Sequence, residues 1–306
     1  MALQTKTCIA RFVAVGAVLL TGCQTPQAPS AAQTAVKQMD VNGALLSFVD
    51  EGQGVPVVFV HAALGDYRTW DRQRAVLAGQ YRTIAFSQRY FGAGPWGQDW
   101  PKFGVPTHAA DLVTFIRALN AGPVHLIAWS YSGHVALDVA LEHPELVRSV
   151  FVYEPSAPTY VADPADQRAV GDDRGATFGP AVQALKDGND PAARHLLDGV
   201  DNRKNVFDGW PAAAQAIVMD NARTMPLLLN QEAPPPITCE QLGQIKPPVA
   251  IARGELDRPF FRIIADYAAK CMPRGERIVV PNASHLWPGQ SPQAFGETVL
   301  AFLNRH

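Results

Sequence analysis

The sequence predicts an α/β fold, in which helices cover a mostly parallel central sheet. Short, continuous apolar runs such as 57–60 and 124–128 are typical of strands that are buried on both faces. Helical patterns separate most of these runs, and this alternation favours parallel strands joined by crossover helices. The 306 residues are 47% hydrophobic and 18% charged, a composition that excludes a disordered or collagen-like chain.

The individual elements follow from apolar spacing and from helix-breaking residues. The predicted strands are 45–50, 57–60, 81–86, 124–128, 147–153, 248–252 and 277–280. The predicted helices are 108–119, 132–142, 261–270 and 292–303. In the first helix, apolar residues recur three or four positions apart, as one face of a helix requires. Pro144 marks the end of the second helix.

Residues 156–239 interrupt this alternation, because they contain no clear strand. The segment holds Ala-rich helical pieces, the run 234–236 of three prolines, and apolar residues that need burial, such as Phe207 and Trp210. A disordered loop would not need this apolar material. We therefore expect a helical cap at 156–239, inserted into a core formed by 39–155 and 240–306.

The N-terminus has the pattern of a secretory signal peptide. Lys6 and Arg11 precede a nine-residue apolar run at 12–20, which is too short to span a bilayer. The run ends at Cys23 in the sequence Leu-Thr-Gly-Cys, which resembles a bacterial lipobox. This resemblance implies a signal peptide at 1–22, a lipidated Cys23 and a flexible tether over 23–38. The expected location is the bacterial cell envelope, more specifically an outer membrane, with the domain facing the periplasm or the surface.

Charge and cysteine content narrow the function further. The formal net charge is −2, and removal of 1–22 leaves 24 basic and 28 acidic residues, so no nucleic-acid partner is expected. If Cys23 carries lipid, Cys239 and Cys271 are the two cysteines left in the mature chain. In an oxidising compartment we predict that they form a disulfide, with two buried free thiols as the alternative.

A candidate nucleophile, Ser130, lies where the strand at 124–128 turns into the following helix. The small residues Ala128 and Ser132 flank it at minus two and plus two, as a tight nucleophile elbow requires. Such a turn lifts the hydroxyl clear of the sheet and points the helix N-terminus at developing negative charge. Serine also needs a base and an orienting carboxylate.

Two later loops supply these groups. Asp257 follows the strand at 248–252, and His285 follows the strand at 277–280. Both lie beyond carboxyl ends of strands, where open α/β sheets bind ligands. We predict Ser130, Asp257 and His285 as a catalytic triad. Glu154, which closes the strand at 147–153, and to a smaller extent Glu255 are alternative acids.

With these three motifs in this order, residues 40–306 resemble the α/β-hydrolase superfamily. The resemblance implies an oxyanion hole made by the backbone N–H groups of Tyr131 and Ala63, with His61 in a structural role. The superfamily usually has Gly where this chain has Ala62. Trp129, Tyr131, Tyr90, Phe91 and Trp287 lie beside the motifs and are candidates to line an apolar substrate pocket.

The implied function is a serine hydrolase that cleaves a carboxylic ester or lactone through an acyl-enzyme. A C–C-bond hydrolase or a perhydrolase would use the same triad, and a non-catalytic ligand-binding protein of this fold is a further alternative. The sequence shows no metal-ligand spacing and no phosphate-binding glycine motif, so neither a metal nor a cofactor is expected. The substrate and the oligomeric state stay open.

Overall fold

A computed structural model describes residues 34–188 and 192–306. The predicted signal peptide at 1–22 and the predicted lipidation site Cys23 lie outside the described residues, as does most of the tether. Within the described ranges, no helix combines the length and the apolar character needed to cross a membrane.

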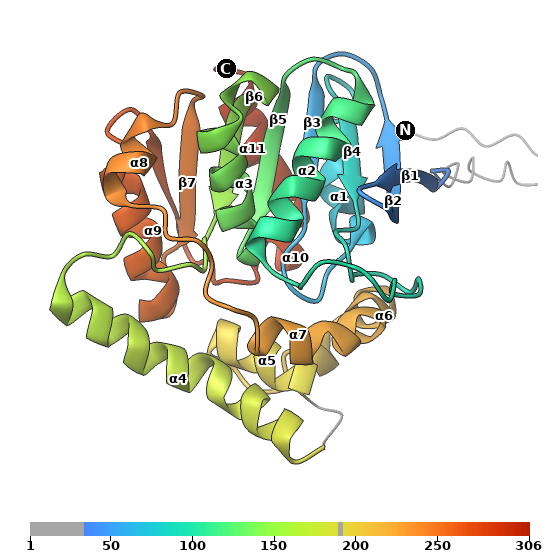
Figure 1. Cartoon of the computed structure of the whole chain (residues 1–306). Coiled ribbons are helices and arrows are strands. Elements are labelled where there is room, and N and C mark those ends of the chain that lie inside the picture. The colour runs from blue at the N-terminus through green and yellow to red at the C-terminus, as the bar shows by residue number, and fades with distance from the viewer. Residues whose placement is uncertain (1–33, 189–191) are drawn as a thin grey trace, which may run out of the picture. The chain divides into compact units, whose positions relative to one another are not determined.

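An eight-stranded, mostly parallel sheet forms the centre of the core, which confirms the predicted fold class (Figure 1). The strand order is β1-β2-β4-β3-β5-β6-β7-β8, and only the β1–β2 and β2–β4 pairs are antiparallel. The strands are β1 Lys37–Val41, β2 Ala44–Glu51, β3 Pro56–Val60, β4 Arg82–Phe86, β5 Val124–Trp129, β6 Val147–Tyr153, β7 Val249–Gly254 and β8 Glu276–Val280.

Strand burial follows position in the sheet. Every residue of the central strands β3 and β5 is buried, as their continuous apolar sequences predict. The edge strand β1 was not predicted, because its sequence KQMDV is too polar to indicate a strand. It forms by pairing with β2 across the turn at Asn42 and Gly43, both of which have positive φ.

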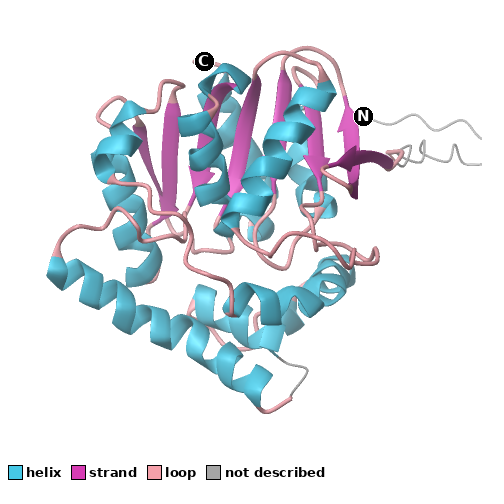
Figure 2. Cartoon of the chain, in the orientation of Figure 1, coloured by secondary structure: helices cyan, strands magenta, loops and turns pink. Residues whose placement is uncertain are grey.

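Helices cover both faces of the sheet (Figure 2). Helices α1 and α11 pack against each other, as do α2 and α3. The core helices are α1 Asp71–Leu77, α2 Val105–Leu119, α3 Tyr131–Glu142, α8 Cys239–Gln244, α9 Pro259–Cys271, α10 Trp287–Gln290 and α11 Pro292–Leu303. Short 3₁₀ turns lie at η1 Tyr67–Trp70 and η2 Pro144–Leu146.

The segment between β6 and α8 forms the helical cap, which lies across the end of the sheet where the parallel strands terminate (Figure 1). Its helices and turns are α4 Pro164–Lys186, α5 Ala192–Asp201, η3 Phe207–Gly209, α6 Ala212–Asn221, η4 Ala222–Thr224 and α7 Met225–Leu229. The long helix α4 packs on α5 within the cap and on α9 of the core. Its N-terminus is capped by the Asp163 carboxylate, which accepts hydrogen bonds from two backbone N–H groups.

Cys239 and Cys271 form a disulfide, with their Cα atoms 5.0 Å apart. Cys239 begins α8, where the chain returns from the cap, and Cys271 ends α9. The bond therefore joins the returning segment to a core helix.

Candidate active site

Ser130 lies at the sharp turn between β5 and α3, where the sequence predicts it. Its φ of 59° and ψ of −118° are unfavourable for a residue with a Cβ, and such strain is typical of functional positions. The backbone is held there by neighbouring strands, since the Ser130 N–H donates to the Tyr153 carbonyl at 2.9 Å. Ser130 is one of the residues that line a large cavity.

The small residues around Ser130 have identifiable roles. The Ser132 hydroxyl donates to the carbonyl of Val60 at 2.7 Å and accepts from the N–H of Trp129 at 3.1 Å. It therefore joins the turn to the carboxyl end of β3. A Cβ on Gly133 would lie 2.7 Å from a side-chain carbon of Val152, so the following position requires glycine.

His285 completes a hydrogen-bonded pair with Ser130. The Ser130 hydroxyl lies 3.0 Å from Nε2 of His285, a distance suited to proton transfer from serine to imidazole. The imidazole is 3% exposed and stacks on the Phe261 ring at a centroid distance of 3.7 Å. Burial lowers the pKa of His285 below its ordinary value of 6.5, so the ring is neutral and able to accept a proton at neutral pH.

The carboxylate that contacts His285 belongs to Glu154, which the sequence offered as an alternative acid. The first-ranked prediction, Asp257, is wrong at this contact. Nδ1 of His285 donates to Oε2 of Glu154 at 2.6 Å, while Asp257 makes no hydrogen bond with His285. Glu154 has a φ of 48°, a left-handed value that directs its chain away from the line of β6. Glu255 instead accepts from the backbone N–H of Asn282 at 3.1 Å, away from the imidazole.

The reason for this difference lies in the sheet. Strands β6 and β7 are parallel neighbours, with Tyr153 paired to Ala252. Their carboxyl ends therefore deliver Glu154 and Asp257 to the same place beside His285. Glu154 is fully buried and Asp257 is 7% exposed. Side-chain length and direction then decide which of the two reaches the imidazole, and these properties are not visible in strand spacing.

The two predicted oxyanion donors lie at the same cavity. Tyr131 is the first residue of α3, so its N–H has no partner within the helix. Among the described residues, no group accepts a hydrogen bond from the Ala63 N–H. The positive φ in this loop belongs to Leu64, at 60°, and not to Ala62. The loop therefore forms without the glycine that the superfamily usually has at position 62.

The buried imidazole of His61 holds this loop in place through hydrogen bonds. Its Nε2 accepts the N–H of Gln88 at 3.0 Å, which leaves the proton on Nδ1, and Nδ1–H donates to the Ala62 carbonyl at 2.8 Å. Burial lowers the pKa of His61 to about 4, so the ring stays neutral. These contacts fit the structural role expected for His61.

The cavity of about 810 Å³ lies between the core and the cap, and Ser130 and His285 are part of its wall. Its volume is within the range of small-molecule sites. The cap supplies much of the wall as apolar side chains from α4 to α7, which sequence spacing did not single out: Phe178, Leu196, Leu197, Val200, Ile217, Val218, Leu228 and Leu229.

Three predicted pocket residues have different positions. Trp129 does line the cavity, and its indole N–H also donates to the carbonyl of His285 at 3.0 Å. Tyr90 lines a separate hollow and packs edge-on against Trp96. Trp287 packs against the Tyr153 ring instead of the cavity. The predictions for Tyr90 and Trp287 are wrong, because proximity to a motif in sequence does not decide which way an aromatic ring points.

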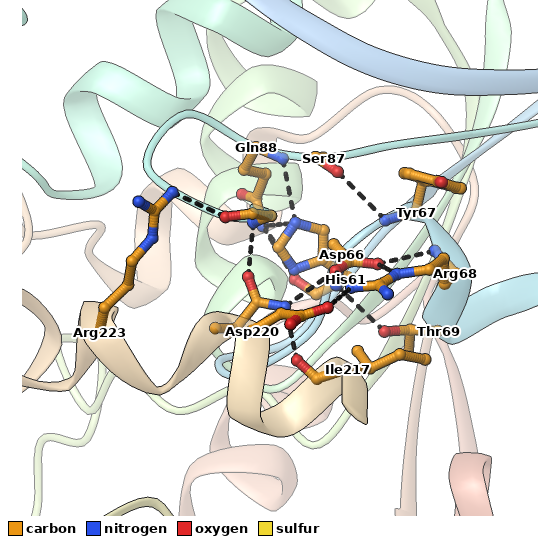
Figure 3. Close-up of polar contacts among 12 residues, drawn as sticks. His61, Asp66, Tyr67, Arg68, Thr69, Ser87, Gln88, Ile217, Asp220 and Arg223 are labelled. Carbon is orange, nitrogen blue, oxygen red and sulfur yellow. Dashed lines mark hydrogen bonds and ion pairs between the residues drawn. The ribbon is translucent and has the colours of Figure 1, made fainter. Parts of the chain in front are cut away.

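A partly buried polar cluster connects the cap to the loop that follows β3 and carries Ala63 (Figure 3). We call it the cap clamp and define it as Asp66, Arg68, Gly92, Asp220 and Asn221. The Asn221 amide donates to Asp66 at 2.8 Å and accepts the N–H of Gly92 at 2.6 Å. Arg68 bridges Asp66 and Asp220. Burial raises the pKa of Asp66. Hydrogen bonds donated to its carboxylate by Arg68 and Asn221 outweigh this effect and hold the pKa below its ordinary value.

Within residues 34–188 and 192–306, no cluster of His, Cys, Asp or Glu side chains could hold a metal ion. The polar groups around Ser130 instead form a chain of hydrogen bonds that runs from hydroxyl to imidazole to carboxylate. This arrangement is able to increase the nucleophilicity of a serine hydroxyl.

Comparisons with known proteins agree with this architecture. A 2-(acetamidomethylene)succinate hydrolase from Mesorhizobium japonicum is 24% identical over 276 residues, which cover 88% of this chain and 95% of the relative. The carboxylesterase CesB from Bacillus subtilis has a similar structure, with a TM-score of 0.70 and 17% identity over 89% of this chain and 92% of its own. A bromoperoxidase from Bacillus anthracis matches with a TM-score of 0.69 and 18% identity over 88% of this chain and all of its own.

The model of the alpha/beta hydrolase family matches residues 57–298, which include Ser130, Glu154, Asp257 and His285. The match extends over both parts of the core and the cap between them. Together with the parallel sheet and the nucleophile turn, it shows that the chain belongs to the alpha/beta hydrolase family.

Proposed function

We propose that the protein is a serine hydrolase that cleaves a carboxylic ester or lactone through an acyl-enzyme. The observation that carries this proposal is the continuous hydrogen-bonded chain from Ser130 through His285 to Glu154, which opens at Ser130 into the cavity. Membership of a hydrolase family supports the reaction class.

In the proposed mechanism, His285 takes the proton of the Ser130 hydroxyl as its oxygen attacks the carbonyl carbon. Glu154 orients the imidazole and stabilises the imidazolium that forms. The N–H groups of Ala63 and Tyr131 stabilise the negative oxygen of the tetrahedral intermediate, a kind of contribution worth about 3–4 kcal/mol per donor in other hydrolases. His285 then gives its proton to the leaving alcohol, and a water activated by His285 releases the acid.

The apolar cap wall supports a substrate with an apolar acyl or alcohol group. We expect p-nitrophenyl butyrate and octanoate to be hydrolysed, and a fluorophosphonate probe to label the protein. Replacement of Ser130 by Ala should abolish labelling and reduce kcat by at least about a thousandfold, since it removes the nucleophile. Labelling that persists in Ser130→Ala, or folded wild-type protein that is neither labelled nor active on esters, would contradict the proposal.

We also propose that Cys23 carries a lipid anchor in the cell envelope, on the basis of the sequence at 20–23. Fractionation of cells that produce the full chain tests this proposal. The wild type should partition with membranes, and Cys23→Ala should release the domain, whereas identical partitioning of the two forms would argue against lipidation.

A further inference from the structure

Asp257 carries a buried carboxyl group to which no described residue donates a hydrogen bond. Both of its carboxyl oxygens are buried, and no N–H or O–H group of the described residues reaches either of them. Its side-chain polar contact is with the carboxyl group of Glu154. An ionised carboxylate in this position would have lost its hydration without gaining a compensating donor, which is strongly unfavourable.

Glu154 has the opposite surroundings. Oε1 accepts the N–H of Gly254 at 2.9 Å, and Oε2 accepts Nδ1–H of His285 at 2.6 Å. Hydrogen bonds to the charged form stabilise a carboxylate. Two carboxyl groups in contact inside a protein cannot both ionise at neutral pH. Because the donors are all on Glu154, the negative charge belongs there and the proton belongs on Asp257.

We propose that Asp257 is held as a neutral carboxylic acid, whose O–H donates a hydrogen bond to the Glu154 carboxylate. In this arrangement Asp257 is a positioning residue: it helps to hold Glu154 ionised and directed at His285. The inference rests on the proposed function, in which Glu154 orients the catalytic imidazole. It assigns different protonation states to the two neighbouring carboxyl groups: Glu154 is ionised and Asp257 is protonated.

The surrounding packing keeps the two carboxyl groups together. A Cβ on Gly254 would lie 2.6 Å from Oδ1 of Asp257 and 2.2 Å from the Ala283 carbonyl oxygen, so this loop is closely packed. Burial, and next the contact with Glu154, raise the pKa of Asp257 to about 10. Burial also raises the pKa of Glu154, but donation by Asp257 and Gly254 opposes that shift.

Other ionisable groups act on this pair. Arg253 on β7 favours the ionised forms of both carboxyl groups, but its guanidinium is paired with Asp266 at 2.8 Å. The remaining ionisable neighbours are His285, the Tyr153 hydroxyl on β6 and Asp201 from the cap. Asp201 is engaged by Ser284 and Arg203.

A matched pair of carboxyl-to-amide substitutions tests the assignment. Glu154→Gln should reduce kcat for p-nitrophenyl butyrate by about 10³–10⁴-fold, because it removes the charge that orients the imidazole. Asp257→Asn should reduce kcat less than about tenfold, because its amide N–H replaces the proposed O–H donor. Asp257→Leu, which has no donor, should reduce kcat more than Asp257→Asn does. A loss in Asp257→Asn as large as that in Glu154→Gln would overturn the proposal.

A second measurement does not depend on catalysis. Above pH 4 the unfolded chain releases the Asp257 proton, whereas the folded protein is proposed to keep it. This difference weakens the folding equilibrium of the wild type about tenfold per pH unit. Asp257→Asn removes the ionisable group and therefore this pH dependence. Urea denaturation from pH 6 to 8 should therefore show the folding constant of Asp257→Asn rising relative to wild type by about tenfold per pH unit.

A constant ratio over this pH range would show that Asp257 is already ionised in the folded protein, and it would overturn the proposal. Because urea denaturation requires no turnover, this result distinguishes a failure of the protonation assignment from a failure of the proposed esterase activity.

Discussion

Two strained residues lie at adjacent strand ends, and both carry proposed catalytic groups. Ser130 directly follows β5 with a φ of 59°, and Glu154 directly follows β6 with a φ of 48°. Neither is glycine, and such backbone conformations cost of the order of 1–3 kcal/mol each. The strained conformation positions the two side chains, because the positive φ turns each of them out of the strand direction and toward His285.

At the same scale, single side chains of the cap are expected to set substrate length. Ile217 on α6 lines the cavity, and its replacement by Trp should fill part of that space. We expect Ile217→Trp to lower kcat/KM for the octanoate ester at least about tenfold more than for the acetate ester, as a long acyl chain loses its site.

Met219→Trp is the matched control for this prediction. Met219 lies on the same helix, is 42% exposed and is not part of the cavity wall. Its ratio of acetate to octanoate activity should stay at the wild-type value. Parallel losses on both esters in Ile217→Trp would contradict a role in chain-length selection.

At the scale of elements, the cap clamp joins α6 to the loop that follows β3. Asn221 is fully buried and makes both of its bridging hydrogen bonds with core residues. Asn221→Ala would leave the Gly92 N–H unpaired and remove one donor from Asp66. We expect a loss of about 1–3 kcal/mol in the free energy of unfolding, measured by urea denaturation.

Asn230→Ala provides the comparison, because Asn230 is an exposed cap asparagine whose hydrogen bonds, within the described residues, go to the Pro226 carbonyl alone. It should change the free energy of unfolding by less than about 0.5 kcal/mol. Equal losses in the two variants would show that the clamp adds no more than an ordinary surface contact.

The disulfide is the second element-scale connection. It closes a loop with a sequence separation of 32, and Cys239 is exposed to reductant. Reduction should lower the free energy of unfolding by about 3–4 kcal/mol, since an open loop gains entropy in the unfolded chain. Urea midpoints with and without dithiothreitol measure this, and coincident curves would contradict it.

At the scale of the whole molecule, the sequence carries the core strands and the order of the motifs more clearly than it carries the site. The β6 prediction, 147–153, coincides with the strand, because a buried strand is a local apolar pattern. The choice between Glu154 and Asp257 depends on two neighbouring strands, so no local pattern reveals it. The cap wall, including Ile217, is likewise settled by packing between helices.

Stability of the whole molecule should depend strongly on acid pH. His61, His108 and His134 are buried, and desolvation lowers their pKa values to about 4, 3 and 4. As the pH falls below 6.5, the unfolded chain binds protons that the folded protein does not. The contribution of these three histidines to stability is therefore fully present above pH 6.5 and is lost as the pH falls toward 4.

Each of these histidines should contribute a loss of about 1.4 kcal/mol per pH unit within that window. Urea denaturation at pH 7, 6 and 5 measures the slope. A slope near zero between pH 6 and 5 would contradict the buried, neutral state of these rings.

The hydroxyl of Ser132 has a mechanical consequence. It ties the turn that carries Ser130 to the end of β3, from which the Ala63 loop emerges. The attacking oxygen and the loop that carries Ala63 are thus linked within the core, by a contact that includes no part of the cap. The cap holds the same loop separately, through the cap clamp, so the Ser132 hydroxyl is a second restraint on the spacing between the nucleophile and the proposed Ala63 donor.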